Sequence, residues 1–127
     1  MSFIFNSSAG PIIVPAKITG PDGDSVAHLA LDTAATTTLI DKEILKLAGY
    51  DPNDLTQQVK MIGVDSEETV NVVTIEKLEA LGVASELLSV VCHSLPAQAG
   101  VDGVLGLNFF RGRRLMIDFR LGVVSVD

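Results

Sequence analysis

The most constraining feature of this sequence is an apolar run that is interrupted by one carboxylate. Residues 29–40 read LALDTAATTTLI, and Asp32 is the only charged side chain among them. Strand-forming residues on both sides carry Asp32 toward the interior of a β-rich fold, where an unpaired carboxylate is costly. We therefore expect either that a partner satisfies Asp32 or that the residue is kept for its chemistry.

A second apolar stretch lies well downstream. Residues 101–110 read VDGVLGLNFF. Val104 and Leu105 are expected to enter the core, Gly106 follows them, and residues 107–111 are predicted to help form a short helix. Asp102 precedes a glycine, and Asp-Gly is a common turn pair, so a turn is the preferred interpretation of that carboxylate.

Together these stretches resemble the retropepsin-like aspartic proteases, which are single-lobed enzymes that work as homodimers. The family pattern is Asp-Thr/Ser-Gly-Ala after an apolar strand, and later two hydrophobic residues and a glycine before a short helix. The matching residues here are Asp32, Thr33, Ala34, Ala35 and 104–106. The resemblance spans residues 11–126, with one departure, since the family glycine is Ala34 in this chain.

The resemblance implies a mainly β fold, a closed β-barrel of the retropepsin (acid protease) type with one or two short helices, as a single domain over residues 1–127. It implies an aspartic endopeptidase that acts on peptides or proteins without a cofactor or a metal. Asp32 of each subunit would form the catalytic dyad of a homodimer. Thr33, Ala34 and Ala35 would support that site.

The resemblance also assigns a flap to the hairpin of residues 58–62 and 69–75. Its substrate-binding residues would be Ile62, Gly63, Val64 and Asp65. The alternation of residues 70–75 allows one side of this hairpin to face a groove. An ordinary surface hairpin is the competing interpretation.

Local signals predict the remaining elements. A hairpin over residues 12–31 turns at 20–24, with Pro15 favouring an edge position. Asp41 is a good N-cap for a short helix over 42–48 that ends at Gly49. A strand is predicted over 87–93 and a last hairpin over 115–119 and 123–126, while 77–84 fits either a short helix or the end of a long strand. Residues 123–126 could also pair with a symmetry mate.

Composition limits the class of partner. The 127 residues carry a net charge of −7, which argues against nucleic acid and anionic membranes, because both need a basic face. The single cysteine, Cys92, rules out an internal disulfide framework and is expected to be a buried, inert thiol. No stretch has the length of a membrane-spanning helix. We expect a cytoplasmic protein or a domain excised from a longer one.

Other polar residues have simpler interpretations than catalysis. His28 and His93 are expected to be structural, Asn108 is expected to support the short helix, and Arg111, Arg113 and Arg114 are expected to form a salt-bridged surface.

Two rival functions stay open. The first is a catalytically weak or inactive retropepsin-fold module for dimerisation or peptide binding, motivated by Ala34. The second is an acidic β-rich domain in which the motif match is accidental.

Overall fold

The computed structural model describes residues 2–51, 58–62 and 67–127, with the side chains of 58–62 and 67–69 left out. Its elements in chain order are β1 (Ser2–Ile4), β2 (Ile13–Gly20), β3 (Gly23–Leu31), β4 (Leu39–Asp41), α1 (Lys42–Leu47), β5 (Gln58–Ile62), β6 (Glu67–Ala80), β7 (Val83–His93), a 3₁₀ turn (Ala97–Ala99), β8 (Gly103–Leu105), α2 (Leu107–Phe110), β9 (Leu115–Asp118) and β10 (Val123–Val126).

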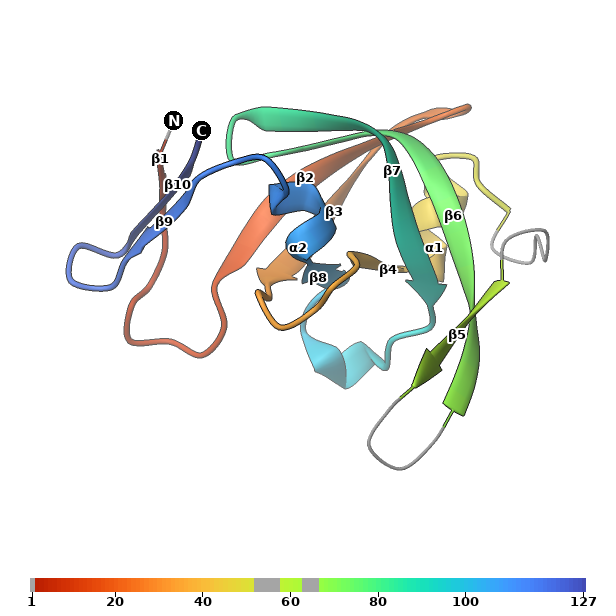
Figure 1. The fold of residues 1–127 in the computed structure, drawn as a ribbon, viewed down its shortest axis with the longest axis horizontal. Coiled ribbons are helices and arrows are strands. Elements are labelled where there is room, and N and C mark those ends of the chain that lie inside the picture. The colour runs from red at the N-terminus through yellow and green to blue at the C-terminus, as the bar shows by residue number, and fades with distance from the viewer. Residues whose placement is uncertain (1, 52–57, 63–66) are drawn as a thin grey trace.

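Six strands close into a barrel in the order β2-β3-β8-β4-β7-β6 (Figure 1). The ring closes where Ala16–Thr19 of β2 pair with Lys77–Ala80 of β6, opposite β7. Strand β5 pairs with the same edge of β6 nearer its start, at Glu67–Asn71. Alternate residues of β2 point inward, so Val14, Ala16 and Ile18 are buried. The predicted mainly β barrel with two short helices is confirmed.

Pro15 lies on β2 just before the stretch that pairs with β6. Its missing N–H therefore interrupts no ladder on that side, in agreement with the predicted edge position.

The ambiguous stretch 77–84 is the end of a long strand. β6 runs to Ala80, and Leu81 and Gly82 form the turn into β7. Leu81 and Leu87 are the only non-glycine residues with positive φ in the described part of the chain, at 55° and 51°. The local helical pattern of 76–82 is thus overridden by pairing of 77–80 with β2 on one side and β7 on the other.

Helix α1 forms as its capping signals predict. The side chain of Asp41 accepts a hydrogen bond from the Glu43 backbone at 2.8 Å, and Gly49 takes φ 96° just after the helix. A second Asp41 oxygen accepts from the Leu95 backbone at 3.0 Å, so the cap also holds the segment after β7. None of the helices among the described residues is long and apolar enough to cross a membrane.

A separate three-stranded sheet, β1-β10-β9, lies beside the barrel and carries both chain termini (Figure 1). Strand β1 was not predicted, because its three residues gain a sheet only from β10, which lies at the other end of the chain. Strand β10 is central, and both its edges are occupied by β1 and β9. Within the single chain residues 123–126 therefore have no unpaired edge, and their pairing with a symmetry mate stays an untested possibility.

Candidate active site

Asp32 is the first residue after β3, and its loop is held by the neighbouring strand. Its backbone N–H donates to the Leu105 carbonyl of β8 at 3.0 Å. The loop also bonds to the carboxylate itself, because the Ala34 N–H donates to Asp32 Oδ1 at 2.9 Å. Within the described residues nothing donates to Oδ2. One carboxylate oxygen is thus fixed by the loop and the other can bond to a water or a ligand.

The two residues after Asp32 form the exposed tip of this turn. Thr33 and Ala34 are exposed in the single chain, and Ala35 is half-buried. Ala34 does not have the positive φ that would require glycine. The alanine at the family's glycine position therefore adopts its backbone conformation without strain, and its methyl group is the only steric addition.

A buried hydrogen-bond network supports the end of the loop. Thr38 is fully buried, and its hydroxyl donates to Asn108 Oδ1 at 2.8 Å while it accepts from the Gly106 N–H at 3.0 Å. Asn108 Oδ1 also accepts from the Thr38 N–H, and Asn108 Nδ2 donates to the Ser89 carbonyl at 2.7 Å. Asn108 therefore joins α2 to the loop and to β7, beyond the helix support that was predicted.

Sequence reasoning missed Thr38. Its position within three consecutive threonines does not reveal which of them is buried. The signal that could have identified Thr38 is its position directly before a predicted strand. Thr38 directly precedes the strand residues Leu39–Asp41, so it is the last residue of the loop that can reach the core.

Gly106 permits close contact between α2 and the loop. A Cβ atom at this position would lie 2.8 Å from the Ala35 carbonyl oxygen and 2.8 Å from the Thr37 carbonyl carbon. The N–H groups of Leu107 and Asn108 donate to the Ala35 and Thr36 carbonyls at 2.8 and 3.1 Å. The glycine is needed because backbone packs directly on backbone.

A groove of about 630 Å³ opens beside the loop. Its walls come from the loop after Asp32 and from strands β4, β6, β7 and β8, and none of the lining residues is charged. They are Ala34, Ala35, Thr36, Thr37, Leu39, Val70, Val72, Ser89, Val91 and Val104. One side of the predicted flap hairpin thus faces a groove, as its alternation indicated. The backbone of Ile62 belongs to β5, whereas Gly63, Val64 and Asp65 lie outside the described residues.

Sequence comparison decides the family. A sequence profile of an aspartyl protease family matches residues 14–109, which include the loop, the groove and α2. The chain belongs to this aspartyl protease family. None of the curated proteins matches it in sequence.

A solved structure has the same fold as the present chain. The match is to a retropepsin-like aspartic protease from Rickettsia conorii, with a TM-score of 0.72 and 15% identity over 99% of this chain and 90% of that one. The retropepsin-like fold is therefore confirmed.

The structure of this aspartyl protease family member does not bring Asp102 to Asp32. Asp102 precedes β8, whereas Asp32 bonds to the last residue of that strand. The Asp102 carboxylate accepts from the His28 N–H at 2.8 Å, its N–H donates to the His28 carbonyl, and its carbonyl accepts from the Asp41 N–H. Asp102 thus joins β3 to β4.

The other polar candidates have structural surroundings. Cys92 is buried, and burial raises the pKa of its thiol, as expected for an inert cysteine. Arg114 forms the predicted surface salt bridge with Asp127, whereas Arg113 forms none with the described residues. Arg113 instead donates to the carbonyls of Phe109 and Ala84 and lies over the Phe109 ring. No described cluster of His, Cys, Asp and Glu could hold a metal ion.

Proposed function

We propose that the protein is an aspartic endopeptidase whose active site is completed by a second copy of the chain. The observation that carries the proposal is the setting of Asp32 in a chain of this family. The Asp32 backbone N–H donates to a carbonyl of β8, and the Ala34 N–H donates to one oxygen of the Asp32 carboxylate. An uncharged groove begins at Ala34.

The chemistry requires two carboxylates around one water. An ionised carboxylate takes a proton from the water, and a protonated one polarises the scissile carbonyl. Two like charges held this close do not both ionise, so the pair shares one proton and titrates as a unit. The loop of one copy provides one carboxylate, because Asp102 is engaged elsewhere. Asp32 of a second copy, related by a two-fold axis, would provide the other.

The substrate of this proposal is an extended peptide or protein segment. It would lie in the groove between the Asp32 loop and the β5–β6 hairpin as an added strand, with main-chain hydrogen bonds holding it. Thr33 would bond across the axis and rigidify the two loops. Its side chain is exposed in the single chain, which leaves its hydroxyl accessible to a partner.

The test is a peptide-library digest at acidic and neutral pH with Asp32→Asn and the matched control Asp102→Asn. The wild type should cleave with an acidic optimum, because one carboxyl of the pair must stay protonated. Asp32→Asn should abolish cleavage and keep the dimer. Asp102→Asn should keep cleavage, since an amide oxygen can still accept from the His28 N–H. Cleavage by Asp32→Asn would refute the proposal.

A second candidate function is a retropepsin-fold module that dimerises or binds peptides with little or no catalysis. The exposed Ala34 methyl group at the wall of the groove favours it, because the methyl group occupies space near the substrate backbone. A folded dimer that cleaves no peptide in the same digest would support this function over the first.

A further inference from the structure

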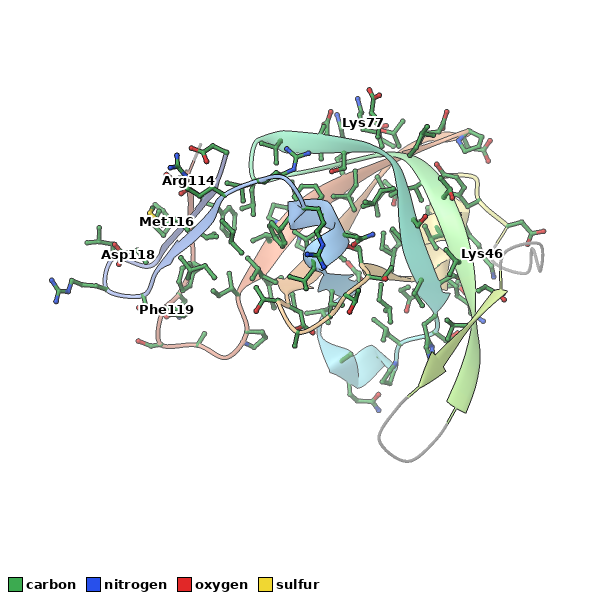
Figure 2. The ribbon with its side chains drawn as sticks, viewed as in Figure 1. Lys46, Lys77, Arg114, Met116, Asp118 and Phe119 are labelled. Atoms are coloured by element: carbon green, nitrogen blue, oxygen red, sulfur yellow. The ribbon has the colours of Figure 1, made fainter. Side chains whose placement is uncertain are left out.

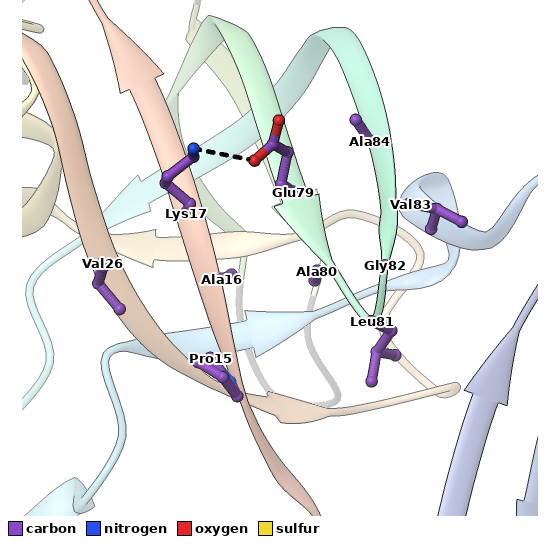
Figure 3. Close-up of a pocket in the computed structure, with 10 residues that line it drawn as sticks. All are labelled: Pro15, Ala16, Lys17, Val26, Glu79, Ala80, Leu81, Gly82, Val83 and Ala84. Atoms are coloured by element: carbon purple, nitrogen blue, oxygen red, sulfur yellow. Dashed lines mark ion pairs between the residues drawn. The ribbon is translucent and has the colours of Figure 1, made fainter. Parts of the chain in front are cut away.

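The Asp102 carboxylate differs from several other charged side chains in the kind of group that it binds. Lys77, at the outer surface in Figure 2, lies 3.0 Å from a carboxylate oxygen of Glu79. Lys17 lies 3.1 Å from the other Glu79 oxygen, beside the surface hollow of Figure 3. The Asp102 carboxylate instead accepts from the backbone N–H of His28 at 2.8 Å, across 74 residues of sequence. It therefore fixes one segment of backbone against another.

Asp102 binds both backbone polar groups of His28. Its N–H donates to the His28 carbonyl at 2.8 Å, and its carboxylate accepts from the His28 N–H. In a parallel sheet these two partners would be backbone groups of the neighbouring strand. Strand β8 begins only at Gly103, so the Asp102 carboxylate takes the place of a backbone carbonyl that a longer β8 would offer. Asp102 thus extends the ladder between β3 and β8 by one residue.

Strand β8 is short, and its first residue has no side chain. It pairs parallel with only three residues of β3, Leu29–Leu31, and parallel pairing is slightly weaker per residue than antiparallel pairing. A Cβ at Gly103 would overlap the Leu39 carbonyl oxygen of β4, so backbone packs on backbone and no side chain holds the strand there. The Asp102 carbonyl accepts from the Asp41 N–H at 2.7 Å. Asp102 therefore connects the start of β8 to both of its neighbours, β3 and β4.

The other end of β8 holds the Asp32 loop. The Asp32 N–H donates to the carbonyl of Leu105, the last residue of β8, at 3.0 Å. Only Gly103 and Val104 separate Asp102 from Leu105, and the chain between them is extended. A shift at the start of this strand therefore moves the carbonyl to which the Asp32 backbone is bound.

We propose that Asp102 is a positioning residue for Asp32. Its carboxylate sets the register of β8 against β3, and the Leu105 carbonyl of β8 sets the position of the Asp32 backbone. This inference rests on the proposed function, because two Asp32 carboxylates share one water only if each loop is accurately placed. A displacement of about 1 Å can lower an enzymatic rate about a hundredfold. Asp102 is not among the residues that line the groove, so it should act on kcat rather than on KM.

The first test compares substitutions of Asp102 by steady-state kinetics on a peptide that the wild type cleaves. Asp102→Ala removes the acceptor and should lower kcat about tenfold or more with little change in KM. Asp102→Asn keeps an oxygen that accepts from the His28 N–H, so its kcat should stay near that of the wild type.

Asp102→Glu provides a second variant should Asp102→Ala fail to fold. It keeps the charge and the acceptor, but its side chain is longer by one CH₂ group. The longer side chain should displace the start of β8 and lower kcat, because the His28 N–H stays in place on β3. A wild-type kcat in Asp102→Glu would overturn the inference.

Tyr50→Phe is the control for a general loss of stability. The Tyr50 hydroxyl bonds to the backbone of Thr19 and Glu76, so its removal weakens the connection of β2 to β6 rather than that of β3 to β8. Tyr50→Phe should lower the free energy of unfolding and keep kcat near the wild-type value. Urea denaturation gives the stability of each variant, and kinetics are measured at a temperature at which all are folded. An equal fall of kcat in Tyr50→Phe and Asp102→Ala would overturn the inference.

Amide hydrogen exchange tests the same connection without catalysis. The Asp32 N–H is protected by its bond to the Leu105 carbonyl. Asp102→Ala should raise the exchange rate of this N–H about tenfold or more, and Asp102→Asn should leave it unchanged, because only the first variant loosens β8. NMR of the isotope-labelled protein measures the rate.

The outcomes separate this inference from the proposed function. Wild-type exchange at Asp32 together with a wild-type kcat in Asp102→Ala would overturn the inference and leave the protease intact. Faster Asp32 exchange in Asp102→Ala, in a protein whose wild type cleaves no peptide, would uphold the connection from Asp102 to Asp32 and count against the protease.

Discussion

The hydroxyl of Thr38 and the side-chain oxygen of Asn108, 70 residues apart in the sequence, form a 2.8 Å hydrogen bond beneath the Asp32 loop. The same oxygen accepts from the Thr38 N–H, and the amide nitrogen of Asn108 donates to the Ser89 carbonyl. The Asn108 side chain therefore fixes the positions of the loop, α2 and β7 relative to one another. The position of the Asp32 loop therefore depends on a side chain of α2 that lies outside the loop.

Replacing Asn108 should destabilise the fold as well as the site. Asn108→Ala leaves the Thr38 N–H, the Thr38 hydroxyl and the Ser89 carbonyl without their partner, and we expect a loss of about 2–4 kcal/mol in the free energy of unfolding. Asn108→Asp keeps the two acceptor bonds and loses the donor to Ser89, so its loss should be smaller. Urea denaturation of the two variants measures the difference.

The control for this network is Thr38→Ser, which keeps the hydroxyl and should cost about 1 kcal/mol through the lost methyl group. Thr38→Val keeps the shape and removes the hydroxyl, so it should cost more than Thr38→Ser. Equal costs for Ser and Val would contradict the role assigned to the hydroxyl.

Gly106→Ala should damage activity more than stability. The φ angle of Gly106 is −98°, so alanine adopts it without backbone strain, and the cost is steric. The new Cβ would press on the backbone of Ala35 and Thr37, and relief requires a shift of the loop that carries Asp32. We expect a loss of about 1–3 kcal/mol in stability and a larger fall in kcat/KM.

Gly10→Ala is the matched control for that substitution. Nothing lies within 4 Å of a Cβ at Gly10 and its φ is outside the left-handed region, so both stability and kcat/KM should stay near those of the wild type. The proposed coupling between α2 and the loop fails if Gly106→Ala and Gly10→Ala cleave peptide equally well.

Ala34→Gly should increase cleavage if the alanine methyl group crowds the cleft. Ala34 is exposed at the groove wall, so removal of its methyl group costs little packing. Stability should fall by about 0.4–1 kcal/mol, because glycine is freer in the unfolded chain. A rise in kcat/KM together with this small loss of stability would show that the Ala34 methyl group limits catalysis. An unchanged kcat/KM would show that the cleft accommodates the methyl group.

Local signals predicted much of the fold, because their causes lie within a few residues. The Asp41 cap, the end of α1 shortly before Gly49 and the last hairpin each depend on neighbouring side chains or one turn. The position of Asp32 after an apolar strand was also readable from the sequence.

The remaining features depend on partners that are distant in sequence. The pairing of β1 with β10 joins the two ends of the chain, and Asp102, which looked like a simple turn residue, bonds to His28, 74 residues away. The burial of Thr38 depends on Asn108 in the same way. Short-range patterns carry no information about which distant group will satisfy a polar side chain, so the support of the site could not be predicted.

The Tyr50 hydroxyl is expected to make the free energy of unfolding depend on pH in the alkaline range. Its hydroxyl donates to the Thr19 carbonyl at 2.8 Å and accepts from the Glu76 N–H at 2.7 Å, so it links β2 to β6. Burial raises the pKa of Tyr50 above its ordinary value of 10.0, because the desolvated phenolate is disfavoured. Tyr50→Phe leaves both backbone groups without this partner and should cost about 1–3 kcal/mol at neutral pH.

The sign of the pH effect follows from the raised pKa of Tyr50. The native state holds this proton more tightly than the unfolded state, so the contribution of Tyr50 is complete below pH 10.0 and declines as pH rises toward its higher native pKa. The stability gap between the wild type and Tyr50→Phe should therefore narrow above pH 10.0. Urea denaturation of both proteins from pH 7 to 11 measures it, and a gap that is constant across this range would contradict the linkage through Tyr50.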